Sequence, residues 1–103
     1  MIQYIVSVSV PNNRAVEWET WMKEKHIDDV MATGKFISAQ LSRIHFPESD
    51  THCGFSTLYI AENMDEYNDY RVNFAPALQA DHAAIFGTSV SASRIVSEEI
   101  KKW

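Results

Sequence analysis

The sequence is poor in cysteine, glycine and proline, with one, three and three of them among 103 residues. A single cysteine, Cys53, excludes an internal disulfide and fits a reducing compartment. Three isolated glycines exclude the glycine-rich loops that hold phosphate groups. The N-terminus MIQYIVSVSVP lacks the basic segment and cleavage site of a signal peptide, and no apolar run approaches the roughly 18 residues of a membrane span. We therefore expect a cytoplasmic protein.

Positive charge is also scarce. The chain has 9 Lys and Arg against 14 Asp and Glu, and its formal net charge is −5. This balance argues against a nucleic-acid-binding surface. By contrast, 46% of the residues are hydrophobic and 12% are aromatic, which is enough for a sizeable core. The length suits one domain, and no linker or repeat divides it, so we expect residues 1–103 to form a single domain.

The first third of the chain predicts a strand followed by a helix. Residues 2–10 alternate in the period-two pattern of a strand, and the PNN segment at 11–13 ends it. A helical pattern then runs to Gly34, which suits the left-handed position at a helix end. Its apolar arc contains Ala15, Trp18, Met22, His26 and Val30. We expect a bend near His26, because the two aspartates at 28 and 29 can start a new helix.

The rest of the chain predicts a hairpin, a second helix and a last strand. Residues 35–46 and 51–61 have strand composition, and the PESD segment between them is typical of a turn. Asn63 and Glu66 have the spacing of a helix capping box. The helix that follows must break or kink at Pro76 and should end at Gly87, before a strand over 88–98.

This element order, βαββαβ, is that of the α+β ferredoxin-like fold. Two right-handed crossovers then place both helices on one face of an antiparallel four-stranded sheet. The strands are expected in the spatial order four, one, three, two. The helices cover one face, so the other face is left open.

The open face of this sheet is expected to be small, uncharged and rich in serine. The alternation assigns to it Ser7, Ser9, Ser38, Gln40, Ser42, Gly54, Ser56, Ser89, Ser91 and Ser93. Ile5, Phe36, Leu58, Ile60 and Ile95 are expected at an apolar end of the same face. Solvated sheet faces carry more polar residues than this. We therefore predict that a second copy of the chain packs on this face, and the alternative is an exposed serine-rich sheet.

Two sets of residues resemble a known family. The first is Trp18, Trp21, Met22 and the block HIDDVMATGKF that begins at His26, and the second is Tyr70, Ala75, Pro76, Leu78, His82 and Phe86. Together they resemble a small bacterial family known as a domain of unknown function. That family is similar to the dimeric α+β barrel superfamily, whose relatives include monooxygenases of antibiotic biosynthesis, muconolactone isomerases, sugar mutarotases and haem-degrading enzymes. The resemblance implies a homodimer and a ligand between sheet and helices, and it implies no particular activity.

The helix-facing side of the sheet brings together groups suited to proton transfer. By connectivity, His26 on the first helix should lie near Tyr59 and Arg94, and we expect these three to be catalytic. Histidine exchanges protons near neutral pH, and arginine and tyrosine stabilise negatively charged oxygen. We expect the ligand to contact Tyr4, Trp18, Met22, Tyr67 and His82. The alternative is structural, with His26 supporting the helix bend and Arg94 reaching from an edge strand to water.

His82 has a less obvious place in this arrangement. Connectivity puts it nearer the opposite end of the sheet from His26, where a hydrogen bond with Glu19 is its expected role. A lone helix histidine can also bind haem, as in the haem-degrading relatives, but nothing else in the sequence supports a haem site. No pair of histidines has helical metal-ligand spacing either. We therefore expect no cofactor and no metal.

These observations support two functions. The first is an enzyme with a small-molecule pocket, comparable to a cofactor-free isomerase or oxygenase. The second is a dimeric binding or interaction module without catalytic activity, in which the polar residues only orient the helices.

Overall fold

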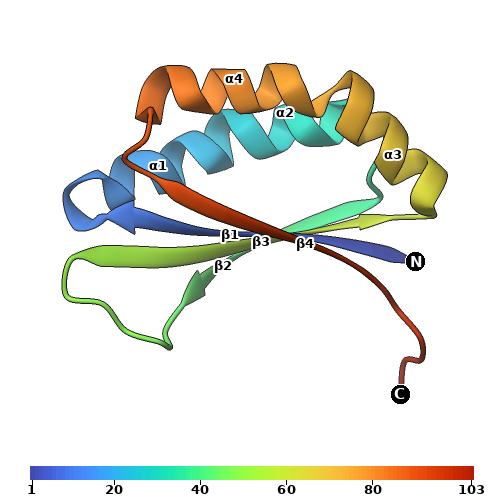
Figure 1. The fold of residues 1–103 in the computed structure, drawn as a ribbon, viewed down its shortest axis with the longest axis horizontal. Coiled ribbons are helices and arrows are strands. Elements are labelled where there is room, and N and C mark those ends of the chain that lie inside the picture. The colour runs from blue at the N-terminus through green and yellow to red at the C-terminus, as the bar shows by residue number, and fades with distance from the viewer.

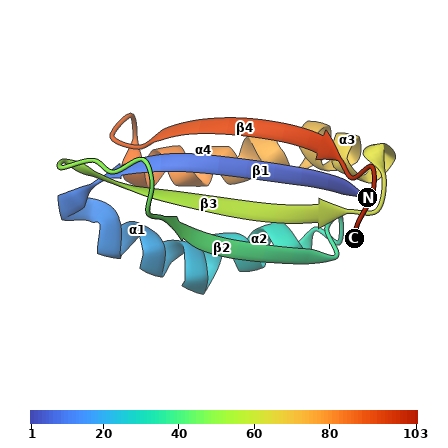
Figure 2. The ribbon, with the colours of Figure 1, turned by 90° about the horizontal axis from the view of Figure 1, so that it is seen from below.

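One antiparallel sheet forms the base of the molecule. The computed structural model describes residues 1–103, and its strands are β1 (Ile2–Pro11), β2 (Ser38–Ile44), β3 (His52–Ala61) and β4 (Ser91–Glu98). They lie in the order β2-β3-β1-β4, as Figure 2 shows from the open side of the sheet. The helices α1 (Ala15–Trp21), α2 (Ile27–Ala32), α3 (Met64–Asn73) and α4 (Ala75–Phe86) all cover the other face (Figure 1). The predicted α+β fold and strand order are confirmed.

The first crossover contains an irregular helix. A short 3₁₀ turn at Asn12–Arg14 leads into α1, and a π-helical turn at Met22–His26 separates α1 from α2. The bend expected near His26 is thus a wider helical turn, a type that is rare and often found at functional sites. Gly34 follows α2 with a positive φ of 75°, which a glycine adopts without strain.

The second crossover is broken as its proline predicts. The Asn63 side chain accepts a hydrogen bond from the backbone N–H of Glu66 and caps α3. The helix stops at Asn73, and α4 starts afresh with Pro76 in its first turn, where the missing N–H has no cost. Gly87 ends α4 with a φ of 56°. None of the helices has both the length and the apolar character needed to cross a membrane.

The strand register places a row of four serines across the open face. Ser7 is paired with Ser56 on one side and with Ser93 on the other, and Ser56 is paired with Ser42. Directly opposite residues in antiparallel strands share a face, so the row crosses all four strands. The neighbouring row is more apolar and consists of Gln40, Leu58, Ile5 and Ile95.

Two residues assigned to the open face lie elsewhere. Phe36 is buried at 5% exposure in the core below the helices. It precedes β2, so the alternation of the strand does not extend to it, and Ile37 is exposed instead. Ser89 precedes β4, and its hydroxyl donates a hydrogen bond to the carbonyl of Phe86 at the end of α4. The prediction was wrong for both, because β2 and β4 are shorter than expected.

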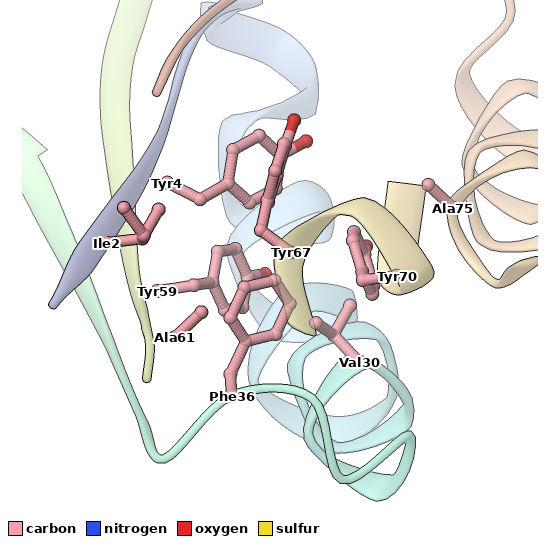
Figure 3. Packing of buried hydrophobic residues seen from close by; sticks show 9 residues of the cluster. All are labelled: Ile2, Tyr4, Val30, Phe36, Tyr59, Ala61, Tyr67, Tyr70 and Ala75. Carbon is pink, nitrogen blue, oxygen red and sulfur yellow. The ribbon is translucent and has the colours of Figure 1, made fainter. Parts of the chain in front are cut away.

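The core between sheet and helices has two parts. One part contains Ile2, Tyr4, Val30, Phe36, Tyr59, Ala61, Tyr67, Tyr70 and Ala75 (Figure 3). The other contains Val8, Val10, Ala15, Trp18, Met22, Phe55 and Phe86. Val6 and Ile27 are half-buried and pack against both parts. The two parts of the core are therefore joined under the helix pair by side chains that are only half-buried.

Candidate functional site

A cavity of about 180 Å³ lies between the two parts of the core. The first part contributes Tyr4, Tyr59 and Tyr70 to its lining, and the second contributes Val8, Trp18 and Met22. One side of the cavity is closed by Ala92 and Arg94 of β4 and by Val90, which directly precedes this strand. Seven of the eight residues expected at the site line this cavity, namely Tyr4, Trp18, Met22, His26, Tyr59, His82 and Arg94.

Tyr67 is the exception. Its ring lies against Tyr4, with the two ring centres 5.2 Å apart, and it does not line the cavity. Figure 3 shows both side chains in this packing, with Tyr67 coming from α3. Tyr67 is buried in the first turn of α3, in the same part of the core as Tyr4. Tyr67 thus lies outside the lining of this cavity and packs against Tyr4, which is part of it.

The placement of His82 corrects a second expectation. Its ring lies 6.4 Å from that of His26, centre to centre, so the two histidines share one cavity. The predicted hydrogen bond to Glu19 is absent, because Glu19 pairs with Lys23 and Arg43. The sequence predicts a bend near His26 and a break at Pro76, and the histidines were expected to lie apart unless these bends bring them together. The break between α3 and α4 and the π-helical turn at His26 bring the two rings together.

Trp18 holds His82 in place. The indole N–H of Trp18 donates a hydrogen bond of 3.0 Å to Nε2 of His82. Because an indole nitrogen is a donor only, Nε2 must be the unprotonated nitrogen of a neutral ring, and the proton is on Nδ1. Burial, followed by the positive charge of Arg94, lowers the pKa of His82. His82 is therefore a neutral hydrogen-bond donor at physiological pH.

His26 is the second neutral histidine of the cavity. Its ring stacks on that of Trp21, with the centres 4.9 Å apart. The pKa of His26 is lowered to about 4, mainly by burial and secondly by the nearby His82. The imidazole is thus uncharged at neutral pH, with one nitrogen free to accept a proton.

Arg94 and Tyr4 form a pair at the opposite wall. Arg94 lies on the edge strand beside Val6, and Nε donates a hydrogen bond of 3.2 Å to the Tyr4 hydroxyl. The two residues are diagonal neighbours across β1 and β4, within reach of a long side chain. Much of Arg94 remains exposed, as the structural alternative expects of an edge strand, yet its guanidinium turns toward the cavity wall.

The remaining polar groups are neutral donors. Burial raises the pKa of the hydroxyls of Tyr59 and Tyr70, so both stay protonated at any physiological pH. The cavity has no Asp, Glu or Lys in its lining, and Arg94 carries its one formal charge. An aromatic space with neutral donors and one cation favours a ligand with negative charge on oxygen.

Sequence reasoning missed Thr57 and Gln79, which also line the cavity. A signal existed for each. Thr57 is a polar residue at a helix-facing position of β3, and it is buried at 2% exposure between the positions of Phe55 and Tyr59. Gln79 lies three residues before His82, which puts both on one side of α4. Leu78, at the edge of the same helix face, completes this side of the cavity.

Solved structures with the same fold cover nearly the whole chain. A variant of MhuD with two manganese protoporphyrin IX bound per active site has a TM-score of 0.73 at 17% identity, over 100% of this chain and 98% of that chain. A variant of SnoaB, a cofactor-independent oxygenase from Streptomyces nogalater, has a TM-score of 0.65 at 12% identity, over 98% and 95% of the two chains. A dimeric ferredoxin-like protein from an uncultured marine organism has a TM-score of 0.55 at 11% identity, over 100% and 98%. At these identities the similarity establishes the fold alone.

Sequence comparison gives a family. No curated protein matches the chain. The family model described as "Domain of unknown function (DUF4286)" matches residues 1–100, which is almost the entire length. The chain therefore belongs to the DUF4286 family, and its fold is that of dimeric α+β barrel proteins.

Proposed function

We propose that the chain is an enzyme that moves a proton to or from a small organic molecule without a cofactor. One observation carries this proposal: the neutral ring of His26 and the Arg94–Tyr4 pair line the same aromatic cavity. A proton acceptor and an oxyanion stabiliser in one enclosed space are the minimum needed for enolisation.

Each group has a defined role in this reaction. His26 accepts a proton from an acidic C–H of the ligand, and the electron pair of that bond becomes the negative charge of an enolate oxygen. The Tyr59 hydroxyl donates a hydrogen bond to that oxygen, and Arg94 supplies a positive charge beside it. Returning the proton to a different carbon gives an isomer, and an enolate is also the form of a substrate that reacts with molecular oxygen. The second of these reactions is of the type named for SnoaB, which is described as a cofactor-independent oxygenase.

The low pKa of His26 fits this role once a ligand is bound. In the empty cavity, a pKa of about 4 makes the ring a weak base. A negative charge developing nearby stabilises the imidazolium and raises this pKa. The proton acceptor thus gains strength when the enolate forms, and in the ground state it stays neutral.

Haem does not fit the residues present. The cavity of about 180 Å³ is below the 300–1,000 Å³ typical of ligand pockets, and a tetrapyrrole far exceeds it. Nε2 of His82 is occupied by the Trp18 N–H, so it is not free to bind iron. Arg94 is the one cation in the lining available to the two propionates of a haem. The porphyrin seen in the MhuD variant therefore has no counterpart here, and a single-ring ligand is the better match, since a cavity of about 150 Å³ holds benzene.

Phenylpyruvate is a suitable probe, because it carries one ring and an enolisable C–H. In deuterated buffer, we expect the protein to accelerate deuterium incorporation at the methylene carbon, measured by proton NMR, while an oxygen electrode records any uptake of oxygen. His26→Gln should lose the acceleration by about 10²-fold or more, in line with the contribution of a general base. Arg71→Gln, on the exposed side of α3, is the matched control and should retain it.

The same experiment tests the alternative function. If phenylpyruvate binds and protects the protein against heat, but neither deuterium nor oxygen is consumed, the chain is a binding module and the enzyme proposal fails. Equal exchange rates for the wild-type protein and His26→Gln would likewise contradict the role of His26.

We also propose that the chain functions as a homodimer through the open face of the sheet. The four-serine row has no charge and no long side chain, so a second sheet can approach closely. Ile95 in the neighbouring row is 61% exposed in the single subunit. The marine relative of the same fold is described as dimeric. Packing two such faces together buries the apolar row. Burial of this surface, which is exposed in the single subunit, is the driving force for dimer formation.

A further inference from the structure

Arg94 differs from most cations of the chain in having no carboxylate partner. The six ion pairs of the chain all involve other cations. These are Arg14, Lys23, Lys25, Lys35 and Arg43. Arg94 has none, although the chain has an excess of five negative charges. It also lines a cavity without an acidic residue. A cation that the protein leaves unpaired beside an apolar space is available to a ligand.

The geometry of the guanidinium favours a carboxylate. Nε is used in the hydrogen bond to the Tyr4 hydroxyl. This contact fixes the plane of the group and leaves the two terminal nitrogens, Nη1 and Nη2, without a side-chain partner. Two parallel N–H donors at this spacing match both oxygens of a carboxylate. A lone alkoxide or carbonyl oxygen would use half of this site.

The walls of the cavity favour a flat body. Trp18 and Met22 come from the first crossover. On the sheet, the rings of Tyr4 and Tyr59 stack, with their centres 5.7 Å apart and 26° between their planes. Aromatic faces of this kind pack well on a planar ring. No acidic side chain is present to accept a cationic ligand.

From these observations we infer that the ligand is a small planar carboxylate, with its carboxylate on Nη1 and Nη2 of Arg94 and its ring between Trp18 and the tyrosines of the sheet. The inference rests on the proposed function in that both require this cavity to be the binding site. It adds that the substrate is already a monoanion before any proton is removed. A second oxygen, on the carbon chain, then carries the charge of the enolate.

Benzoate and benzamide separate the charge from the shape, because they have nearly the same size and differ in ionisation. We expect NMR titration of the wild-type protein to give at least tenfold tighter binding for benzoate, with shifts at the residues of the cavity. Arg94→Gln should bring the two affinities close to equal. Arg94→Lys keeps the charge but has no bidentate donor pair, so its preference should be intermediate. Arg71→Gln should behave as the wild-type protein, and thermal unfolding of each variant verifies that it is folded.

Three outcomes would overturn the inference: equal binding of benzoate and benzamide by the wild-type protein, a benzoate preference that survives in Arg94→Gln, or no binding of benzoate or phenylpyruvate at all. Failure of the two proposals can be distinguished. Benzoate binding that depends on Arg94, without exchange of phenylpyruvate, would support the ligand class and contradict the enzyme proposal. Exchange of phenylpyruvate that is lost in His26→Gln, together with equal binding of benzoate and benzamide, would support the enzyme and contradict the ligand class.

Discussion

The indole of Trp18 and the imidazole of His82 are joined by a hydrogen bond across the interface of α1 and α4. Trp18 is 1% exposed and belongs to the core, whereas His82 lines the cavity. A core residue thereby fixes which nitrogen of a cavity residue carries the proton. His82 presents Nδ1–H as a donor, and in the proposed reaction the proton acceptor is His26.

Replacing Trp18 with Phe should allow His82 to adopt both of its neutral tautomers. The aromatic ring remains, but the N–H that occupies Nε2 is gone. We expect the ¹⁵N spectrum of His82, which distinguishes a protonated from an unprotonated ring nitrogen, to change from a single Nδ1–H form to a mixture. Trp21→Phe is the matched control, since Trp21 touches the His82 ring edge-on and donates no hydrogen bond to it. An unchanged His82 spectrum in Trp18→Phe would show that the hydrogen bond does not set the tautomer.

The depressed pKa of His26 should make the protein less stable in mild acid. The unfolded chain binds a proton on this residue near pH 6.5, and the folded chain does so near pH 4. Between these values the unfolded state holds more protons, so stability is complete above pH 6.5 and falls as the pH drops toward 4. The loss from this residue is at most roughly 3 kcal/mol. The charged or titratable groups around it are His82, Asp29, Asp81 and Lys25.

His26→Gln provides the comparison for this pH effect. The variant cannot titrate at this position, so its melting temperature should fall less between pH 6.5 and pH 4. Glu19 and Asp69, whose pKa values are lowered by their ion pairs, contribute the same sign of effect in both proteins and cancel in the difference. Parallel melting curves for the two proteins across this range would mean that His26 is solvated as an ordinary histidine.

A lysine at Ser7 should prevent the dimer. Ser7 is in the middle of the four-serine row, on the central strand β1. An ammonium group there would be buried against the second sheet, at a cost of several kcal/mol. Light scattering after size exclusion should give a dimer for the wild-type protein and a monomer for Ser7→Lys. Thr20→Lys adds the same charge on the exposed side of α1 and should remain dimeric, so a dimeric Ser7→Lys would place the interface elsewhere.

Removing the cap of α3 should destabilise the fold modestly. The Asn63 side chain satisfies the backbone N–H of Glu66 at 2.9 Å. Asn63→Ala should cost about 1 kcal/mol, or roughly 4–8 °C in melting temperature for a domain of this size. Asn68→Ala, on the exposed surface within the same helix, should have little effect or a slightly stabilising one. Equal losses for both variants would argue against the capping contribution.

The fold could be predicted because its signals are local and repeated. Alternation of side chains indicates β1. Pro76 and Gly87 indicate where the helices of the second crossover begin and end. The order of the elements then corresponds to one standard topology. Errors arose where an element is shorter than its sequence pattern. Phe36 and Ser89 both stand just before a strand, where alternation no longer decides which way a side chain points.

The site was harder to predict, because it depends on distances between helices. Tyr4, Tyr59 and Arg94 were located through strand register, which fixes neighbours across a sheet. His82 was misplaced, since nothing in a periodic pattern states how far one helix slides along another. The hydrogen bond from Trp18 that orients it joins residues 64 positions apart in the sequence.

The π-helical turn at Met22–His26 has a consequence for how such a chain changes over generations. A π turn holds about one residue more than an α turn, so it amounts to a single insertion that the surrounding helix has absorbed without losing its packing on the sheet. Without that one residue, the side chains on one side of the turn would rotate by about 100° around the helix axis relative to those on the other side. The position of His26 in the cavity therefore depends on the length of this one turn as well as on the fold.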